Sequence, residues 1–245
     1  MVENRDGGTL VMVATPIGNL DDMSVRAVKE LSRCDLILCE DTRHSGVLLR
    51  HYDIAVPTTS YGSHNLRSKV PWILQQLAAG RRLGLICDAG MPGISDPGSV
   101  LVRAVLDRGF GVEAVPGASA ILLALVLSGL PTDRFVFDGF LPHKKGRQTR
   151  LRELATETRT IVLYESPHRL SKTLQELYDH LGDREAAVAR ELTKIYEEIR
   201  RGRLSEHIAH FSRLEPRGEF VLVVAGLAYR ASRVPQSDDH AEGVA

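Results

Sequence analysis

Short apolar runs alternate along this chain with longer segments in which apolar residues recur every three or four positions. The runs at 36–39 and 112–115 have the length and composition of buried strands, whereas 66–79 and 98–108 show helical spacing. Strands that alternate with helices are typical of an open, mostly parallel sheet covered on both faces. The first half of the chain is therefore predicted to be an α/β domain with strands at 9–14, 36–39, 83–87 and 112–115, and helices from near 24, from 44 to 51, and at 66–79, 98–108 and 118–128. The last of these helices is apolar throughout and is expected to be buried.

The pattern changes after the turn-forming segment 129–133. Strands are predicted at 135–137, 160–164, 186–189, 196–199 and 220–225, with helices at 167–181 and 204–211 and a basic helical piece after the first strand. Several connections are too short for crossovers, which favours some antiparallel pairing and a mixed sheet. We thus predict two α/β domains, residues 9–130 and 131–227, followed by a disordered tail at 228–245 that lacks periodicity.

Composition and charge narrow the classes of function. The chain is 43% hydrophobic, and its 31 Lys and Arg residues balance 31 Asp and Glu residues. A nucleic-acid site would therefore have to be a local basic patch. The longest apolar run, 120–127, is too short to cross a bilayer, and the polar N-terminus has no signal-peptide core. A cytoplasmic protein without a membrane partner is expected.

The three cysteines do not form a metal-binding pattern. Cys34, Cys39 and Cys87 are odd in number, show no CxxC spacing and lie in or beside apolar strands. Buried reduced thiols are predicted, and no metal site. The GxGxxG and GxxxxGK[ST] fingerprints are also absent from the sequence, which argues against NAD and ATP as ligands.

The segment 88–98 is the strongest candidate for a ligand-binding loop. It follows a predicted strand and holds three glycines, two prolines and two aspartates, which permit unusual backbone angles and a close approach to a ligand. Asp96 is expected to cap the next helix, with Pro97 in its first position. The loop 116–120 also brings small residues to a helix start, although a plain turn at 116–117 and a helix cap at Ser119 would be the purely structural interpretation. Together the two loops have room for an adenosine-sized ligand.

Charged residues gather at two places in the second half. Glu165, His168 and Arg169 follow a predicted strand, and a similar polar exit at 190–194 is equally consistent with a solvated turn. The segment 143–152 holds five Lys or Arg residues without an acidic residue until Glu153, which favours contact with a phosphate backbone over a solvated face.

Five sequence blocks occur together in one order: 14–20, 40–43, 88–98, 116–120 and 164–169. On these blocks the chain, from about residue 10 to 226, resembles a bacterial family of small-subunit rRNA methyltransferases within the tetrapyrrole methylase (class III) superfamily. The resemblance implies 2′-O-methylation of a cytidine in 16S rRNA within the assembled small ribosomal subunit. It also implies S-adenosyl-L-methionine as methyl donor, a donor cleft between two α/β domains, and a homodimer.

The same resemblance implies roles for individual residues. The donor would lie against Ala89, Gly90, Met91, Ile94, Ser95, Ser119, Ala120, Tyr164, Glu165 and Leu192. The RNA would face Asn19, Arg43, His64, Asn65 and Arg169, together with Lys144, Lys145, Arg147 and Arg150 of the basic segment. Transfer to a hydroxyl also needs a proton acceptor, and Glu165, His168 and Asp41 are chemically able to act as one.

Two other functions stay open. The first is methylation of a porphyrin-like acid with the same donor, although such a pocket would need more apolar lining in the second domain. The second is an RNA-binding module without catalysis, against which the intact donor loop argues. The resembling family often continues into a small helical region, where this chain has a polar segment after Leu227. We therefore expect the methyl-transfer core to be retained, but not the full affinity for RNA.

Overall fold

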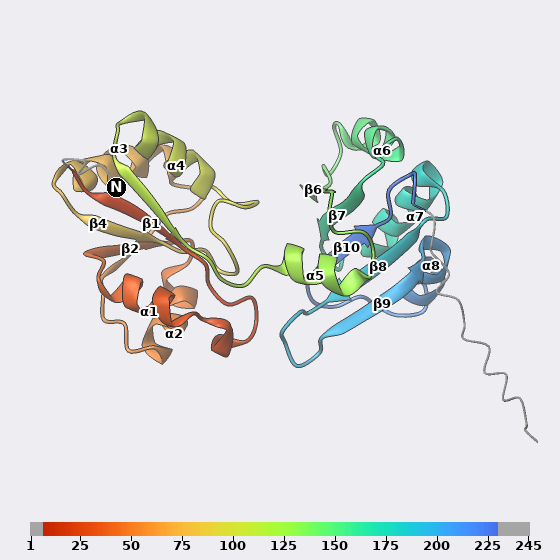
Figure 1. The fold of residues 1–245 in the computed structure, drawn as a ribbon, viewed down its shortest axis with the longest axis horizontal. Coiled ribbons are helices and arrows are strands. Elements are labelled where there is room, and N and C mark those ends of the chain that lie inside the picture. The colour runs from red at the N-terminus through yellow and green to blue at the C-terminus, as the bar shows by residue number, and fades with distance from the viewer. Residues whose placement is uncertain (1–6, 230–245) are drawn as a thin grey trace, which may run out of the picture.

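The structure, a computed structural model, describes residues 7–229, which form two lobes joined by a narrow waist (Figure 1). The predicted tail lies outside these residues except for its first two positions. Each lobe is built on one five-stranded sheet. The two-domain α/β architecture predicted from the sequence is thus confirmed, with a parallel sheet in the first lobe and a mixed sheet in the second.

The first sheet is entirely parallel, with strand order β3-β2-β4-β1-β5. Its strands are β1 (Thr9–Val13), β2 (Leu36–Cys39), β3 (Thr58–Ser60), β4 (Arg82–Leu85) and β5 (Gly111–Val115). The sequence analysis did not predict β3, because this edge strand is short and polar and carries no apolar run. All four connections cross over, so the carboxyl ends of the strands meet at one edge of the sheet.

Helices cover both faces of this sheet. Successive side chains of β1 point to opposite faces and join two different hydrophobic cores. Leu10 and Met12 join the core beneath α3 (Leu66–Ala78) and α4 (Gly98–Asp107). Val11 and Val13 join the opposite core beneath α1 (Val25–Ser32) and α2 (Thr42–His51). A short 3-10 helix, η1 (Leu20–Asp22), follows β1. Burial on both faces explains why the central strands are almost continuously apolar. All three cysteines are buried here as free thiols, as predicted.

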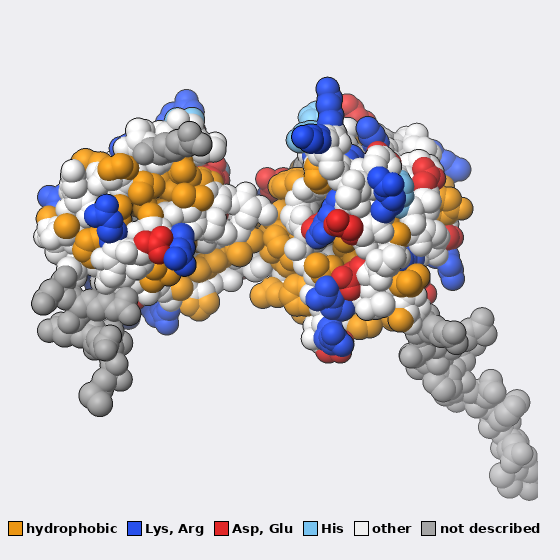
Figure 2. Space-filling model, turned by 90° about the horizontal axis from the view of Figure 1, so that it is seen from above, with side chains coloured by type: hydrophobic (Ala, Val, Ile, Leu, Met, Phe, Trp, Pro, Cys, Tyr) orange, Lys and Arg blue, Asp and Glu red, His pale blue; other side chains and the backbone are white. Residues whose placement is uncertain are grey.

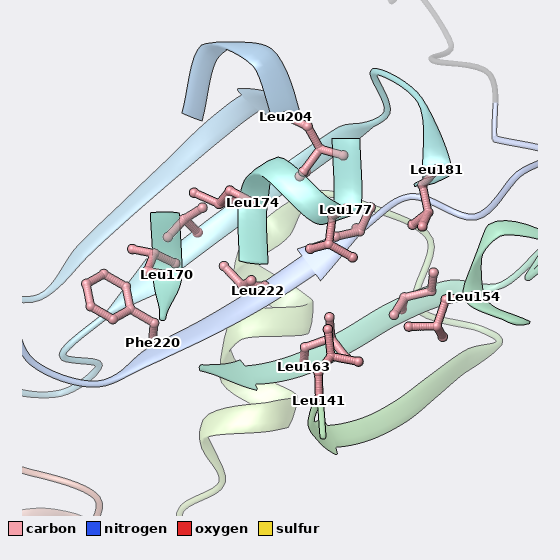
Figure 3. Close-up of a cluster of buried hydrophobic side chains, with 14 of the residues drawn as sticks. Leu141, Leu154, Leu163, Leu170, Leu174, Leu177, Leu181, Leu204, Phe220 and Leu222 are labelled. Carbon is pink, nitrogen blue, oxygen red and sulfur yellow. The ribbon is translucent and has the colours of Figure 1, made fainter. Parts of the chain in front are cut away.

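The second sheet is mixed, with strand order β6-β7-β10-β8-β9. Its strands are β6 (Phe135–Phe140), β7 (Thr160–Glu165), β8 (Glu185–Arg190), β9 (Glu198–Arg203) and β10 (Phe220–Val224). Only β6 and β7 are parallel, and the other pairs are antiparallel. One face packs on α6 (Arg147–Ala155), α7 (Leu170–Leu181) and α8 (Leu204–Phe211) around a leucine-rich core (Figure 3).

The opposite face of the second sheet is covered by α5 (Ala120–Ser128). This helix precedes the predicted domain boundary, yet Ile121, Ala124 and Leu125 pack against β7, β8 and β10 (Figure 1). Its other side is exposed at Leu122 and Val126, so the expectation of a fully buried helix is wrong. Because α5 directly follows the loop after β5, it ties the ligand edge of the first sheet to the second lobe.

No helix within residues 7–229 is long and apolar enough to cross a membrane.

Candidate functional site

A cleft of about 510 Å³ lies between the carboxyl edge of the first sheet and the second lobe. All ten residues predicted to contact the methyl donor line it: Ala89, Gly90, Met91, Ile94, Ser95, Ser119, Ala120, Tyr164, Glu165 and Leu192. They come from four segments that are far apart in the sequence: the loop after β4, the start of α5, the end of β7 and the loop after β8. The cleft is also lined by residues that sequence reasoning missed, namely Ile17, Glu40, Cys87, Asp96, Ile121, Phe140, Ser166, Pro167, Ala189 and residues 218–221.

The loop after β4 is held against the loop after β1 by backbone pairing. Thr15 N–H donates to Gly90 O at 2.9 Å, and Gly90 N–H donates to Thr15 O at 3.1 Å. The buried Thr15 hydroxyl also donates to Cys87 O at 3.0 Å. These bonds fix the position of the Gly90 backbone at the cleft wall.

The same loop contains backbone in the left-handed region. Gly90 and Gly93 have φ values of +81° and +93°, which glycine adopts readily, but Ser95 has φ of +61°. Such a conformation is uncommon for a serine and clusters at functional sites. Asp96 stabilises the turn, because its carboxylate accepts from Gly93 N–H at 2.8 Å and from Gly98 N–H at 2.6 Å.

The predicted helix cap at this loop needs one correction. Pro97 is not the first helical residue but the N-cap position, and α4 begins at Gly98. Asp96 still satisfies the first N–H of the helix, as a capping residue would, although it lies one position earlier than a regular N-cap.

The loop 116–120 packs directly on the end of β1. A Cβ atom added at Gly117 would lie 2.9 Å from the Ala14 Cβ, so any larger residue there would force the two loops apart. Ser119 caps α5, its hydroxyl accepting from Leu122 N–H at 3.4 Å. This cap agrees with the structural interpretation of Ser119, and the same residue lines the cleft.

The second lobe supplies an apolar and aromatic wall. Tyr164 packs against Phe140 and Phe137, with ring centroids 5.5 Å and 5.1 Å apart. Burial raises the pKa of the Tyr164 phenol, which therefore stays neutral at physiological pH. With Leu192 and Ala189 beside it, this wall suits the flat, weakly polar face of a heterocyclic ring.

Glu165 is a fully satisfied buried carboxylate. It accepts from the Thr173 hydroxyl at 2.5 Å and from Ser166 N–H at 2.8 Å, and it lies 3.2 Å from Arg169 Nε. The Thr173 hydroxyl in turn accepts from Arg147 Nη2 at 2.7 Å. This network holds the loop after β7 in place, and it leaves Glu165 poorly suited to take a proton from a substrate.

The other two candidate proton acceptors, Asp41 and His168, are also poorly suited to that role. Asp41 caps α2, and Arg43 holds the pKa of its carboxyl well below the usual range through a hydrogen bond and an ion pair. A carboxylate with so low a pKa is a weak base. His168 is exposed and is not among the residues that line the cleft.

The basic segment divides into exposed and buried cations. Lys144 and Lys145 are exposed. Arg147 is buried and donates to Glu176, to Pro142 O and to Thr173, so the prediction that it contacts RNA is wrong. A run of like charges in the sequence could not show that an acidic residue on α7 meets one of them inside the fold.

The other residues predicted to contact RNA differ in exposure and in how many bonds their side chains already form within the protein. Asn19, Arg43 and His64 are exposed. The Arg150 guanidinium pairs with Asp138 and Glu153. The Asn65 amide holds its own loop, accepting from Gly62 N–H and donating to Ser60. Arg169 donates to Leu141 O at 2.5 Å besides its contact with Glu165, so its guanidinium is largely occupied inside the protein.

The sequence is similar to a known protein family and to named relatives. The family model of the tetrapyrrole (corrin/porphyrin) methylases matches residues 9–208. A Synechocystis sp. protein named ribosomal RNA small subunit methyltransferase I is 52% identical over 221 residues, which are 89% of this chain and 79% of that protein. A Thermotoga maritima protein of the same name is 46% identical over 219 residues, covering 89% and 99% of the two chains.

Solved structures share the fold at low sequence identity. The methyltransferase CobJ aligns with a TM-score of 0.69 and 20% identity, covering 92% of this chain and 97% of its own. A uroporphyrin-III C-methyltransferase from Thermus thermophilus, complexed with S-adenosylhomocysteine, aligns with a TM-score of 0.62 and 21% identity, covering 90% and 98%. At this level of identity the likeness concerns the fold alone.

The Glu165 network leads to a prediction about stability. Arg169→Leu removes the ion pair of Glu165, whose side chain has no exposed surface. We therefore expect the free energy of unfolding to fall by about 3 kcal/mol. Urea denaturation at pH 7 measures this loss. Arg103→Leu, which breaks an exposed pair on α4, should cost less than about 1 kcal/mol. Equal losses in the two variants would contradict the structural role of Arg169.

Proposed function

This chain belongs to the tetrapyrrole (corrin/porphyrin) methylase family, and from that premise we propose that it methylates a cytidine 2′-oxygen of 16S rRNA with S-adenosyl-L-methionine as donor. The observation that carries the proposal is that the ten residues predicted to contact the donor come together from four separate segments around one cleft. The relatives named ribosomal RNA small subunit methyltransferase I, at 46–52% identity over most of the chain, support an RNA substrate rather than a porphyrin-like acid.

The residues of the cleft fit the proposed donor. Its volume of about 510 Å³ lies within the range of small-molecule sites. Small side chains or bare backbone line the first-lobe wall at Ala89, Gly90, Ser119 and Ala120, which leaves room for an adenosyl group. Tyr164 and Leu192 would cover the adenine, and the Gly90 backbone would lie close to the ribose or the amino-acid part.

The donor supplies a methyl group bonded to a positively charged sulfur, which is already activated for transfer. The task of this chain is then to hold the ribose hydroxyl in line behind that methyl group and to exclude water. Such positioning can lower a barrier by about 7–11 kcal/mol in favourable cases. The paired loops after β1 and β4, joined through Thr15 and Gly90, provide a rigid frame for this alignment.

The proposed RNA surface lies around the mouth of the cleft. Lys144 and Lys145 are in the loop that follows Phe140, a cleft residue, and Arg43 follows Glu40, another cleft residue. His64 lies in the loop after β3, which the Tyr61 hydroxyl joins to Pro97 O at 3.3 Å. These exposed cations and the histidine would bind phosphates on either side of the target nucleotide.

The proposal also includes a homodimer that acts in the cytoplasm on the assembled small ribosomal subunit. Leu122 and Val126 expose 54% and 68% of their surface on the side of α5 that faces away from the sheet. Hydrophobic side chains are visible at the junction of the two lobes, where this helix lies (Figure 2). An apolar surface of this kind is suited to burial against a second copy of the chain.

A methyl-transfer assay tests the proposed activity. Purified protein, tritiated S-adenosylmethionine and isolated small subunits should give labelled 16S rRNA, and mapping should locate the label on a cytidine 2′-oxygen.

Ala120→Leu places extra carbons in the cleft and should weaken donor binding at least about tenfold by calorimetry.

The control for this variant is Ala209→Leu, the same substitution at an exposed position of α8 outside the cleft. It should bind the donor as the wild type does. Donor affinity that is unchanged in Ala120→Leu would contradict the assignment of the cleft, and label on a base instead of a ribose would contradict the 2′-oxygen.

A salt titration tests the RNA surface. The double variant Lys144→Gln/Lys145→Gln should bind 16S rRNA fragments more weakly, and its slope of log affinity against log salt should be shallower by about one to two, because fewer counterions are released. The double variant Lys29→Gln/Arg108→Gln removes two exposed cations, one in the last turn of α1 and one directly after α4, and should keep the wild-type slope. Identical slopes in all three proteins would exclude the lysines from the interface.

A further inference from the structure

Four carboxylates line the cleft, and three of them are already engaged. Asp96 accepts from two backbone N–H groups of its own turn, and Glu165 is held by Thr173, Ser166 and Arg169. Glu219 lies 2.9 Å from Lys194 Nζ. The fourth, Glu40, forms no ion pair and no hydrogen bond with another side chain in the described range 7–229.

The position of Glu40 is set by the rigid part of the first lobe. It follows β2 directly, and β2 pairs in parallel with both β3 and β4. The backbone N–H of Asp88, which follows β4, donates to the Glu40 carboxylate. The strand end thus fixes the backbone position of Glu40 beside the cleft, and a carboxylate with a single backbone donor has acceptor capacity left over.

The surroundings of Glu40 favour its taking up a proton. Burial raises the pKa of its carboxyl above the usual value, and the negative charges of Asp96 and Asp88 raise it further. The Cys87 thiol faces the same space, but burial raises its pKa to about 12, so it adds no charge at neutral pH. The pKa of Asp41, the next residue in the chain, shifts in the opposite direction because Arg43 stabilises its charged form. A carboxylate shifted toward neutrality is a better base than an ordinary one.

We propose that Glu40 is a catalytic residue that accepts the proton of the ribose hydroxyl during methyl transfer, an inference that rests on the proposed function. The hydroxyl oxygen forms a bond to the methyl carbon while the carbon–sulfur bond breaks and its electron pair stays on sulfur. The hydroxyl proton passes to a Glu40 carboxylate oxygen and from there to solvent. The sulfonium becomes a neutral thioether and the proton carries away the positive charge, so atoms and charges balance.

The substitution Glu40→Gln isolates this role, because the amide oxygen can still accept from Asp88 N–H but the side chain cannot take a proton. Single-turnover rates with saturating donor and small subunits should fall about 10²-fold or more. The wild-type rate should decrease at acidic pH as Glu40 becomes protonated, and this limb of the pH profile should be lost in Glu40→Gln. Glu40→Asp should keep the limb at an intermediate rate.

Two measurements that do not depend on turnover accompany the rates. Calorimetry with S-adenosylhomocysteine and with an rRNA fragment should give wild-type affinities for Glu40→Gln. Carbon-13 NMR of labelled glutamate carboxyls should show a resonance that titrates above the usual range and is absent from Glu40→Gln. Asp107→Asn, which removes a carboxylate at the far end of α4, should leave both rate and pH profile unchanged.

The outcomes separate this inference from the proposed function. A wild type that binds no donor and labels no RNA overturns the proposed function, and the role of Glu40 with it. A wild type that labels RNA, together with a Glu40→Gln variant of unchanged rate and pH profile, overturns only the role of Glu40. Loss of donor affinity with a normal rate at saturation would make Glu40 a donor-binding residue and also overturn its role as a base.

Discussion

Parallel pairing of the first sheet is the constraint on which the site depends. Since β1, β2, β4 and β5 all run in one direction, their following loops must emerge at a common edge. Side chains on both faces of the sheet are buried under helices, so the residues available to contact a ligand are those in the loops. Small residues around Gly90 and Ser119, and the acid Glu40, reach the same space for this reason alone.

The second lobe completes the cleft through contacts that begin with α5. This helix continues from the loop after β5 and packs on the antiparallel strands of the other sheet, so a single covalent connection sets one wall against the other. The contact is reinforced by a hydrogen bond of 3.2 Å from Asn19 N–H to the Thr193 hydroxyl. Thr193 and Glu191 both have positive φ, which indicates that the exit of β8 is shaped for this junction.

Near the cleft, the buried charged side chains pair with one another, whereas the lysines of the basic segment are exposed to solvent. Arg147, Arg169 and Glu165 stand beside one another in a network that holds a loop, whereas Lys144 and Lys145, only a few residues away from Arg147, are exposed. Arginine suits the internal positions, because its planar guanidinium donates several hydrogen bonds in fixed directions. The buried carboxylate Glu165 is thereby neutralised inside the second lobe, and the two lysines stay exposed to solvent.

Local patterns alone were enough to predict the two α/β domains, most strands and the ligand loops, since apolar periodicity and clusters of glycine and proline act over a few residues. They missed β3, whose residues are polar, and the role of α5, whose apolar faces fit either lobe. Which acids meet Arg147, and that Glu40 rather than Asp41 enters the cleft, was decided only by the tertiary structure. Burial and ion pairing depend on residues brought from distant elements, and no local pattern records those partners.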